Sequence, residues 1–228
     1  MELIRIENGQ KHYQLEKAEI PALEGINLVI SPGERVCLMG PSGSGKSTLL
    51  NIIGCVDTLS EGRIVIAGND ASSLKDAQLS EFRNRTMGFV FQTFNLIPVL
   101  SVFENVEYPL LLQRVPKTER GARVMELLER VGLKDFHRRG PERLSGGQRQ
   151  REAIARALVT RPRLVIADEP TAALDHATGK AIMELMVEMN YSAGSTLVFA
   201  THDPAVARYA GRLLTMTDGR IVEDREVA

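Results

Sequence analysis

The sequence is poor in cysteine and in aromatic residues. It contains two cysteines, no tryptophan and 5% aromatic residues among 228 residues. Cys37 and Cys55 both stand in apolar surroundings, so we expect two reduced thiols in a hydrophobic core rather than a disulfide or a metal site. This composition argues against a disulfide-dependent secreted fold and against a cysteine-rich metal module.

Long apolar runs and an excess of one charge are also missing. No apolar stretch approaches the ~20 residues that cross a bilayer, and residues 1–7 carry charges where a signal peptide needs an apolar segment. We therefore expect a soluble chain that reaches a membrane only through a partner. Lysine and arginine number 28 against 29 aspartate and glutamate, and this balance argues against a dedicated nucleic-acid binder.

The chain does contain short β-branched segments that alternate with longer helical patterns. This order predicts an α/β fold with a largely parallel sheet. A terminal hairpin is indicated by Asp218 and Gly219 between two strand-like segments. The predicted strands are 3–7, 26–30, 35–39, 63–67, 88–91, 164–167, 196–200 and 212–217, and the predicted helices of the middle region are 118–131 and 148–159.

The middle of the chain differs from its ends, because strand signals fade between about 101 and 160 and helical signals replace them. We therefore predict one sheet-based core that is interrupted by a helical insertion. The core is expected to comprise residues 1–92 and 161–228, and the insertion residues 93–160.

A glycine-rich segment follows the predicted strand 35–39 and precedes a helical one. It fits the pattern G-x-x-x-x-G-K-[ST], whose backbone N–H groups surround phosphates at a helix N-terminus. Lys46 would reach the β- and γ-phosphates, and the Ser47 hydroxyl would bind Mg²⁺. The predicted nucleotide site comprises Gly40, Pro41, Ser42, Gly43, Ser44, Gly45, Lys46, Ser47 and Thr48.

Two acids end the apolar strand 164–167, and the carboxyl end of a strand is where α/β proteins bind ligands. Successive strand residues point to opposite faces, so the two acids can have different roles. We predict that Asp168 binds Mg²⁺, directly or through water, and that Glu169 polarises the water that attacks the γ-phosphate.

A second possible anion site opens the helix 148–159. Ser145, Gly146, Gly147 and Gln148 follow Leu144 and combine a serine hydroxyl with glycine N–H groups. Together with the phosphate loop, this pentad resembles the signature of the ATP-binding cassette (ABC) superfamily. The resemblance covers essentially the whole chain, with the motifs in the family's order.

The resemblance implies roles for further residues. Tyr13 matches the aromatic residue that stacks on adenine, and Gln92 matches the glutamine that touches Mg²⁺ and joins the core to the helical insertion. His202 matches the histidine that contacts the γ-phosphate, and residues 172–175, which end in Asp175, match a loop that crosses the dimer interface. The catalytic set is then Lys46, Gln92, Glu169 and His202, whereas His12, His137 and His176 are interpreted as surface residues.

By the same resemblance, the fold is a P-loop NTPase (RecA-like) core with a mostly parallel sheet, an antiparallel β subdomain and an inserted α-helical subdomain. Two subunits would pair head to tail, as a homodimer, with each ATP between one chain's Lys46 loop and the other's Ser145 loop. Two departures stand out. Ala172 replaces a serine that is frequent in the crossing loop, and Glu152 stands where relatives usually have an apolar residue. Glu152 would either adjust dimer contacts or face solvent.

Three segments, 51–57, 88–98 and 104–110, resemble the small ATPases of the lipoprotein-releasing and macrolide-efflux group. Such a subunit would work on the cytoplasmic face of the membrane with a separate permease, which would dock beside the Gln92 loop on an apolar set. Alternatives are an amino-acid-type importer and a regulator without transport. The basic stretch 137–163 is interpreted as a solvated helical surface. A nucleic-acid partner is not expected, because its arginines lack interleaved aromatic residues. The apolar set comprises Phe94, Leu96, Ile97, Val99, Leu100 and Phe103.

Overall fold

The structure is a computed structural model that describes residues 2–15 and 18–227. The chain forms two compact units, one of residues 1–83 and 196–228 and one of residues 84–195. The boundary at residue 83 falls inside helix α2, Asp76–Thr86. The functional division expected from the sequence, 1–92 and 161–228 against 93–160, stays a prediction.

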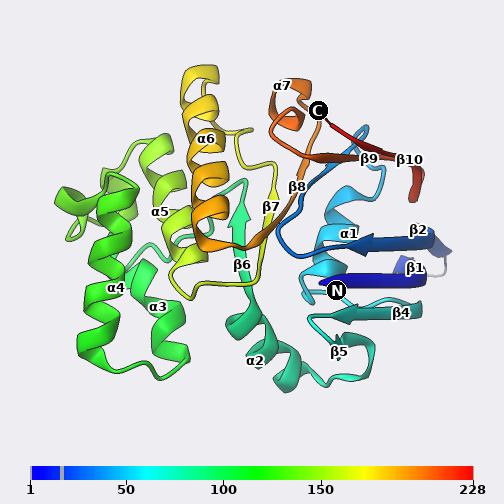
Figure 1. The fold of residues 1–228 in the computed structure, drawn as a ribbon, viewed down its shortest axis with the longest axis horizontal. Coiled ribbons are helices and arrows are strands. Elements are labelled where there is room, and N and C mark those ends of the chain that lie inside the picture. The colour runs from blue at the N-terminus through cyan, green and yellow to red at the C-terminus, as the bar shows by residue number, and fades with distance from the viewer. Residues whose placement is uncertain (1, 16–17, 228) are drawn as a thin grey trace. The chain divides into compact units, whose positions relative to one another are not determined.

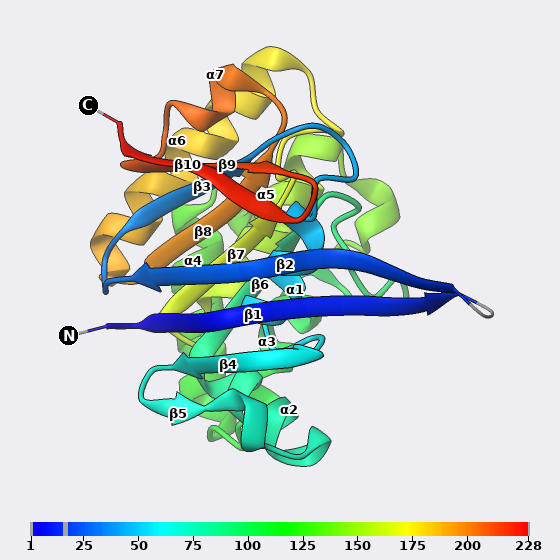
Figure 2. The same cartoon turned by 90° about the vertical axis from the view of Figure 1, so that its right-hand side faces the viewer.

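The first unit contains a sheet in which β3 lies between β8 and β9; Figure 1 labels β8, β9 and β10, and Figure 2 labels β3. Its neighbours β8 and β9 both run parallel to it, and β10 pairs antiparallel with β9. Val36, Cys37 and Leu38 are fully buried, as expected for a strand covered on both faces. The elements are β3 (Arg35–Met39), α1 (Lys46–Ile53), β8 (Thr196–Thr201), α7 (Pro204–Ala207), β9 (Arg212–Thr217) and β10 (Arg220–Glu226).

The first unit also contains an antiparallel sheet of order β2-β1-β4-β5 (Figure 2). Ile4 of β1 lies opposite Ile30 of β2 and Ile66 of β4, and all three side chains are fully buried. Alternate residues thus form one apolar face, which fixes the register. The elements are β1 (Ile4–Leu15), β2 (Ala18–Ile30), β4 (Glu61–Ile66), β5 (Asn69–Asp70) and the 3₁₀ turn η1 (Ala71–Ser73).

The second unit is mostly helical and has two parallel strands, β6 and β7. Helix α5 packs closely on β6, because a Cβ at Gly88 would lie 2.1 Å from the carbonyl oxygen of Ala157. Helices α3 and α5 each begin with a capping box. The elements are β6 (Met87–Phe91), α3 (Val102–Leu112), α4 (Lys117–Arg130), η2 (Lys134–Phe136), η3 (Pro141–Arg143), α5 (Gly146–Leu158), β7 (Leu164–Asp168) and α6 (His176–Ala193).

The α/β fold class predicted from the sequence is confirmed, with both parallel and antiparallel sheets present. Strands 35–39 and 212–217 have the predicted bounds, whereas β1 and β2 are longer than predicted because they pair with each other over most of their length. Helix α2 was not predicted, since its sequence is mostly polar and lacks an apolar stripe. Cys37 and Cys55 are buried and lie outside any disulfide among the described residues, as expected. None of the helices in the described residues is long and apolar enough to span a bilayer.

Candidate nucleotide site

The predicted phosphate loop connects β3 to α1 in the first unit. Gly45 stands at the N-terminus of α1 with φ 99°, and no side chain caps this helix end. Gly43 has φ 81°, and a Cβ placed there would meet nothing within 4 Å. The loop therefore presents its backbone N–H groups at an open surface, where an anion is favoured by the helix dipole.

Backbone atoms of neighbouring strands force glycine at two loop positions. A Cβ at Gly40 would lie 2.2 Å from the carbonyl oxygen of Met216, and one at Gly45 would lie 2.7 Å from that of Ala22. The loop is also tied to the terminal hairpin, because the N–H of Gly219 donates to the carbonyl oxygen of Ser44 at 3.1 Å. The curl of the loop is thus held by the sheets around it.

Lys46 lies over this loop, with its side chain buried. Its ammonium group donates to the carbonyl oxygens of Gly40 at 2.8 Å and Pro41 at 2.9 Å. Ser44 is also buried, and its hydroxyl has no hydrogen-bond partner within the described residues. A lysine at the centre of the loop and an unsatisfied hydroxyl are features of a site for a phosphorylated ligand.

The parallel pairing of β3 and β8 brings His202 next to this loop. Met39 pairs with Thr201, so Gly40 and His202 each follow the carboxyl end of neighbouring strands. His202 is exposed, and Asp203 behind it caps α7 by accepting from the N–H of Ala205 at 2.8 Å. The imidazole therefore stands at the edge where ligands of parallel sheets bind.

Tyr13 lies on β1, is 40% exposed, and also belongs to the first unit. Its hydroxyl donates to the Asp57 carboxylate at 2.9 Å, and the Lys11 ammonium lies 5.0 Å from the ring centre. Burial raises the pKa of Tyr13, and a hydrogen bond with Thr48 acts in the opposite direction. That bond places the Tyr13 hydroxyl beside Thr48, the last residue of the phosphate loop, and part of the side chain is open to solvent.

In the second unit, the parallel pair β6 and β7 brings Gln92 and the two acids together. Phe91 pairs with Asp168, so Gln92 and Glu169 follow neighbouring strand ends. Gln92 is exposed, and both acids are half-buried. Glu169 has φ 46°, a left-handed conformation that costs a non-glycine residue about 1–3 kcal/mol. Strain of this kind is concentrated at functional sites.

The loop after Gln92 is held by helix α5. The guanidinium of Arg156 donates to the carbonyl oxygens of Asn95 at 2.5 Å and Phe94 at 2.8 Å. The guanidinium of Arg149 lies 5.1 Å from the ring centre of Phe94. Sequence reasoning missed both arginines, because it interpreted the basic stretch as a solvated surface. Their spacing on one side of a helix is the signal that could have found them.

The signature residues line an open cavity of about 510 Å³ together with the crossing loop. Ser145 caps α5 by accepting from the N–H of Gln148 at 3.3 Å, and the Gln148 amide oxygen accepts from the N–H of Ser145 at 2.9 Å. Asp175 caps α6 by accepting from the N–H of Thr178, and hydrogen bonds with the Thr178 side chain and then with its backbone lower the pKa of Asp175. The cavity is lined by Gly132, Leu133, Ser145, Gly146, Gly147, Gln148, Arg151, Ala173, Leu174, Asp175 and Thr178.

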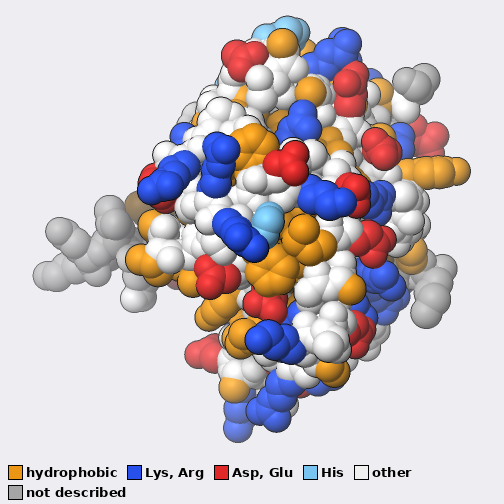
Figure 3. Space-filling view, turned by 90° about the vertical axis from the view of Figure 1, so that its left-hand side faces the viewer, with side chains coloured by type: hydrophobic (Ala, Val, Ile, Leu, Met, Phe, Trp, Pro, Cys, Tyr) orange, Lys and Arg blue, Asp and Glu red, His pale blue; other side chains and the backbone are white. Residues whose placement is uncertain are grey.

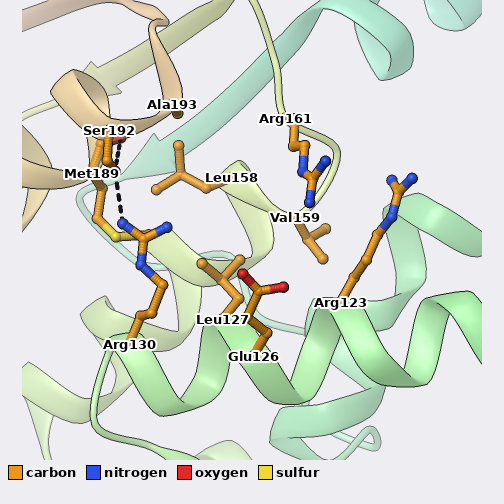
Figure 4. Close-up of a pocket in the computed structure, with 10 residues that line it drawn as sticks. All are labelled: Arg123, Glu126, Leu127, Arg130, Leu158, Val159, Arg161, Met189, Ser192 and Ala193. Atoms are coloured by element: carbon orange, nitrogen blue, oxygen red, sulfur yellow. Dashed lines mark hydrogen bonds between the residues drawn. The ribbon is translucent and has the colours of Figure 1, made fainter.

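Arg151 is the cation of this cavity that sequence reasoning did not identify. Its guanidinium donates to the carbonyl oxygen of Val131 at 3.2 Å, which fixes it at the cavity wall. A second cavity, among α4, α5 and α6, contains none of the predicted site residues, and in it Arg130 donates to the Ser192 hydroxyl at 2.7 Å (Figure 4).

The chain offers oxygen donors of the kind that Mg²⁺ prefers. The predicted ligands are the Ser47 hydroxyl of the first unit and the Gln92 amide and Asp168 carboxylate of the second unit. No group of three or more histidine, cysteine, aspartate or glutamate side chains that could hold a metal occurs in the described part of the chain. The oxygen chemistry of the three predicted ligands suits a hard cation such as Mg²⁺, and their assignment to one metal stays a prediction.

Comparison with known proteins agrees with these features. A family model described as "ABC transporter" matches residues 23–172. An uncharacterised ABC transporter ATP-binding protein of Bacillus subtilis, YvrO, is 48% identical, over 97% of this chain and 96% of the relative. The macrolide export ATP-binding/permease protein MacB of Sodalis glossinidius is 46% identical over 97% of this chain, which spans only 34% of that protein.

Among solved structures, the chain is similar to the ATP-binding cassette MJ0796, a protein of Methanocaldococcus jannaschii. The structure is described as a dimeric, post-hydrolysis state bound to ADP and Pi. The TM-score is 0.91 and the identity 44%, with 99% of both chains covered.

Proposed function

The chain belongs to the ABC transporter family and hydrolyses ATP, and we propose that two copies of it pair head to tail to drive a separate membrane permease. The observation that carries this proposal is the second glycine cradle at Ser145–Gln148, which opens into a cavity shared with the crossing loop. A chain that already has a phosphate loop needs such a cradle for the nucleotide of a partner subunit. The dimeric state of the related cassette supports the pairing.

In the proposed dimer, each ATP is bound by one chain's phosphate loop and by the other chain's signature loop. Lys46 contacts the β- and γ-phosphates, Tyr13 stacks on the adenine, and Asp175 contributes at the interface. The closed state is favoured by ATP because only in this state do both loops contact each nucleotide.

For hydrolysis, Glu169 accepts a proton from the attacking water while His202 contacts the γ-phosphate. Gln92 positions this water and senses the γ-phosphate from the loop that α5 holds. Ser47, Gln92 and Asp168 would hold Mg²⁺, which neutralises the developing negative charge on the phosphates. Loss of the γ-phosphate contacts then reopens the dimer.

The permease contact is proposed for the segment after Gln92. Val99 is 89% exposed, and Leu96, Ile97 and Leu100 beside it are only half-buried. On the face drawn in Figure 3, hydrophobic side chains lie exposed between charged side chains of both signs. The apolar side chains of residues 96–100 suit contact with an amphipathic helix better than contact with a nucleic acid. The subunit would then lie on the cytoplasmic face of the membrane, and the MacB relatives, which join both parts in one chain, support this arrangement.

The test is a pull-down of tagged Glu169→Gln protein with ATP from detergent-solubilised membranes of its host, with co-purified chains identified by mass spectrometry. A permease with few spans and a large extracytoplasmic domain would support the lipoprotein-release or efflux type. A many-span permease would point to an importer. Recovery of soluble partners alone would overturn the transport function and leave the ATPase.

A further inference from the structure

The side of α5 that holds the Gln92 loop carries an acid between two arginines. Arg149, Glu152 and Arg156 are three and four residues apart, a spacing that places them on one side of the helix. The two guanidinium groups contact the turn at Phe94 and Asn95. Both turn residues have a left-handed backbone, with φ 63° and 48°, and the arginine contacts add to the turn's own hydrogen bonds in holding this strained conformation.

Glu152 is fully buried, so it does not face solvent. Neither of its carboxylate oxygens has a hydrogen-bond partner within the described residues. The same holds for the buried Nε of Arg149. An unsatisfied acceptor and an unsatisfied donor thus lie one turn apart on the same helix. A buried carboxylate is stable only when it is neutral or paired, so an ionised Glu152 would favour pairing with a nearby arginine.

Apart from Arg149 and Arg156, the basic side chains on α5 and on the elements that pack on it are exposed, as Lys117 and His176 are, or already contact another group. Strand β6 has no titratable side chain, Glu104 is occupied in the capping box with Ser101, and Tyr108 is exposed. On α5 itself, Arg151 is bound to the carbonyl oxygen of Val131. Four cations of α4 and α6 contact other groups. Arg120 pairs with Glu107, Arg123 with Glu119, and Lys180 with Glu184. The guanidinium of Arg130 donates to the Ser192 hydroxyl.

We propose that Glu152 is a positioning residue that competes with the Phe94–Asn95 turn for Arg149 and Arg156. The neutral carboxyl leaves both guanidinium groups on the turn, as in the structure. The ionised carboxylate attracts one of them, which weakens the hold of α5 on the loop that carries Gln92. Burial raises the pKa of Glu152 to about 7, with the positive charge of Arg156 acting in the opposite direction. Both forms are therefore populated near neutral pH.

The direct test is hydrogen exchange of the full chain, followed by mass spectrometry of a peptide that covers residues 92–100. Glu152→Gln removes the ionisable group and keeps its shape. Wild type and variant share this peptide, so their intrinsic exchange rates are equal at each pH. We expect equal protection at pH 6, and about tenfold faster exchange in the wild type at pH 8, the effect expected for loss of one hydrogen bond to a charged group.

Two further variants keep this test decisive. Glu152→Leu cannot compete for arginines and is expected to behave as Glu152→Gln does. It replaces Glu152→Gln as the test variant if the glutamine variant does not fold. Glu188→Gln removes an exposed acid of α6 and is expected to follow the wild type. Equal protection of the peptide in wild type and Glu152→Gln at both pH values overturns the proposal.

The consequence for catalysis rests on the role proposed above for Gln92. If that role is correct, kcat for ATP falls in the wild type between pH 6 and pH 8 relative to Glu152→Gln, while KM for ATP changes little. A pH-dependent difference in exchange without any difference in kcat would support the positioning role of Glu152 and contradict the role of Gln92. The two proposals can therefore fail separately.

Discussion

The two glycine cradles of the chain are built differently, although each stands at the N-terminus of a helix. The phosphate loop leaves the first turn of α1 without a side-chain cap, and its lysine is buried over the loop. In the signature loop, Ser145 and Gln148 cap each other, so part of the donor capacity is used within the chain. This difference predicts that the first loop binds nucleotide by itself. The second loop is expected to contact a nucleotide only when that nucleotide is already bound to the partner subunit.

The largest effect that would test this contrast is expected from Lys46→Ala. It removes the cation of the phosphate loop and should weaken ATP binding by about 100-fold or more, since charge-assisted hydrogen bonds are lost. Titration calorimetry with ATP would measure this loss. Lys180→Ala, which removes an exposed lysine of α6, should bind ATP as the wild type does. Retention of wild-type affinity by Lys46→Ala would contradict the role of the loop.

Glu169→Gln should separate binding from turnover. The amide cannot accept the proton of the attacking water, so kcat should fall by about 100-fold or more while ATP remains bound. Size-exclusion chromatography with ATP should then show a stable dimer. Normal turnover by this variant would disprove the assigned role of Glu169.

Gly147→Ala tests the second cradle. The new Cβ would lie 2.6 Å from Cγ2 of Thr178, which should displace the signature loop from the crossing loop. We expect ATP hydrolysis to fall by about tenfold, an effect of 1–2 kcal/mol, while ATP binding to the isolated chain stays unchanged. Gly121→Ala is a matched control, because a Cβ there meets nothing within 4 Å. An equal loss of ATP hydrolysis in both variants would show that the effect of Gly147→Ala is not specific to the signature loop.

Glu152→Gln should change stability in a pH-dependent way. The pKa of Glu152 is raised from 4.5 to about 7 in the folded chain, so the folded state binds more protons than the unfolded one between these values. Stability of the wild type therefore falls as the pH rises through this range, by up to about 3 kcal/mol. Glu152→Gln should be more stable than the wild type at pH 8, and this advantage should shrink toward pH 5. Thermal unfolding at the two pH values measures the difference, and an advantage that does not depend on pH would contradict it.

Tyr13→Ala is expected to have the smallest effect. Loss of one partly exposed stacking contact should weaken ATP binding by about fivefold. Calorimetry would resolve such a change, with Tyr191→Ala as the control because that ring is 85% exposed in the second unit. Equal affinity in Tyr13→Ala and wild type would remove Tyr13 from the adenine site.

The sequence by itself determined the α/β class, the position of most strands and the local motifs. These features depend on short-range chemistry: glycines where φ is positive, a helix that follows at once, and acids at the end of an apolar strand. The phosphate loop and the acids 168–169 could therefore be recognised without coordinates. The length of β1 and the polar helix α2 could not, because their stability comes from pairing and packing rather than from a local pattern.

Only the tertiary structure determined which residues from distant parts of the chain contact the motifs and hold them in place. Arg149 and Arg156 hold a turn more than fifty residues earlier in the chain, and the signature loop shares its cavity with the crossing loop. The sequence left Glu152 open between an interface and solvent, and the structure buries it. The burial and the partners of a charged side chain depend on segments that are distant in sequence, so a local pattern does not contain this information.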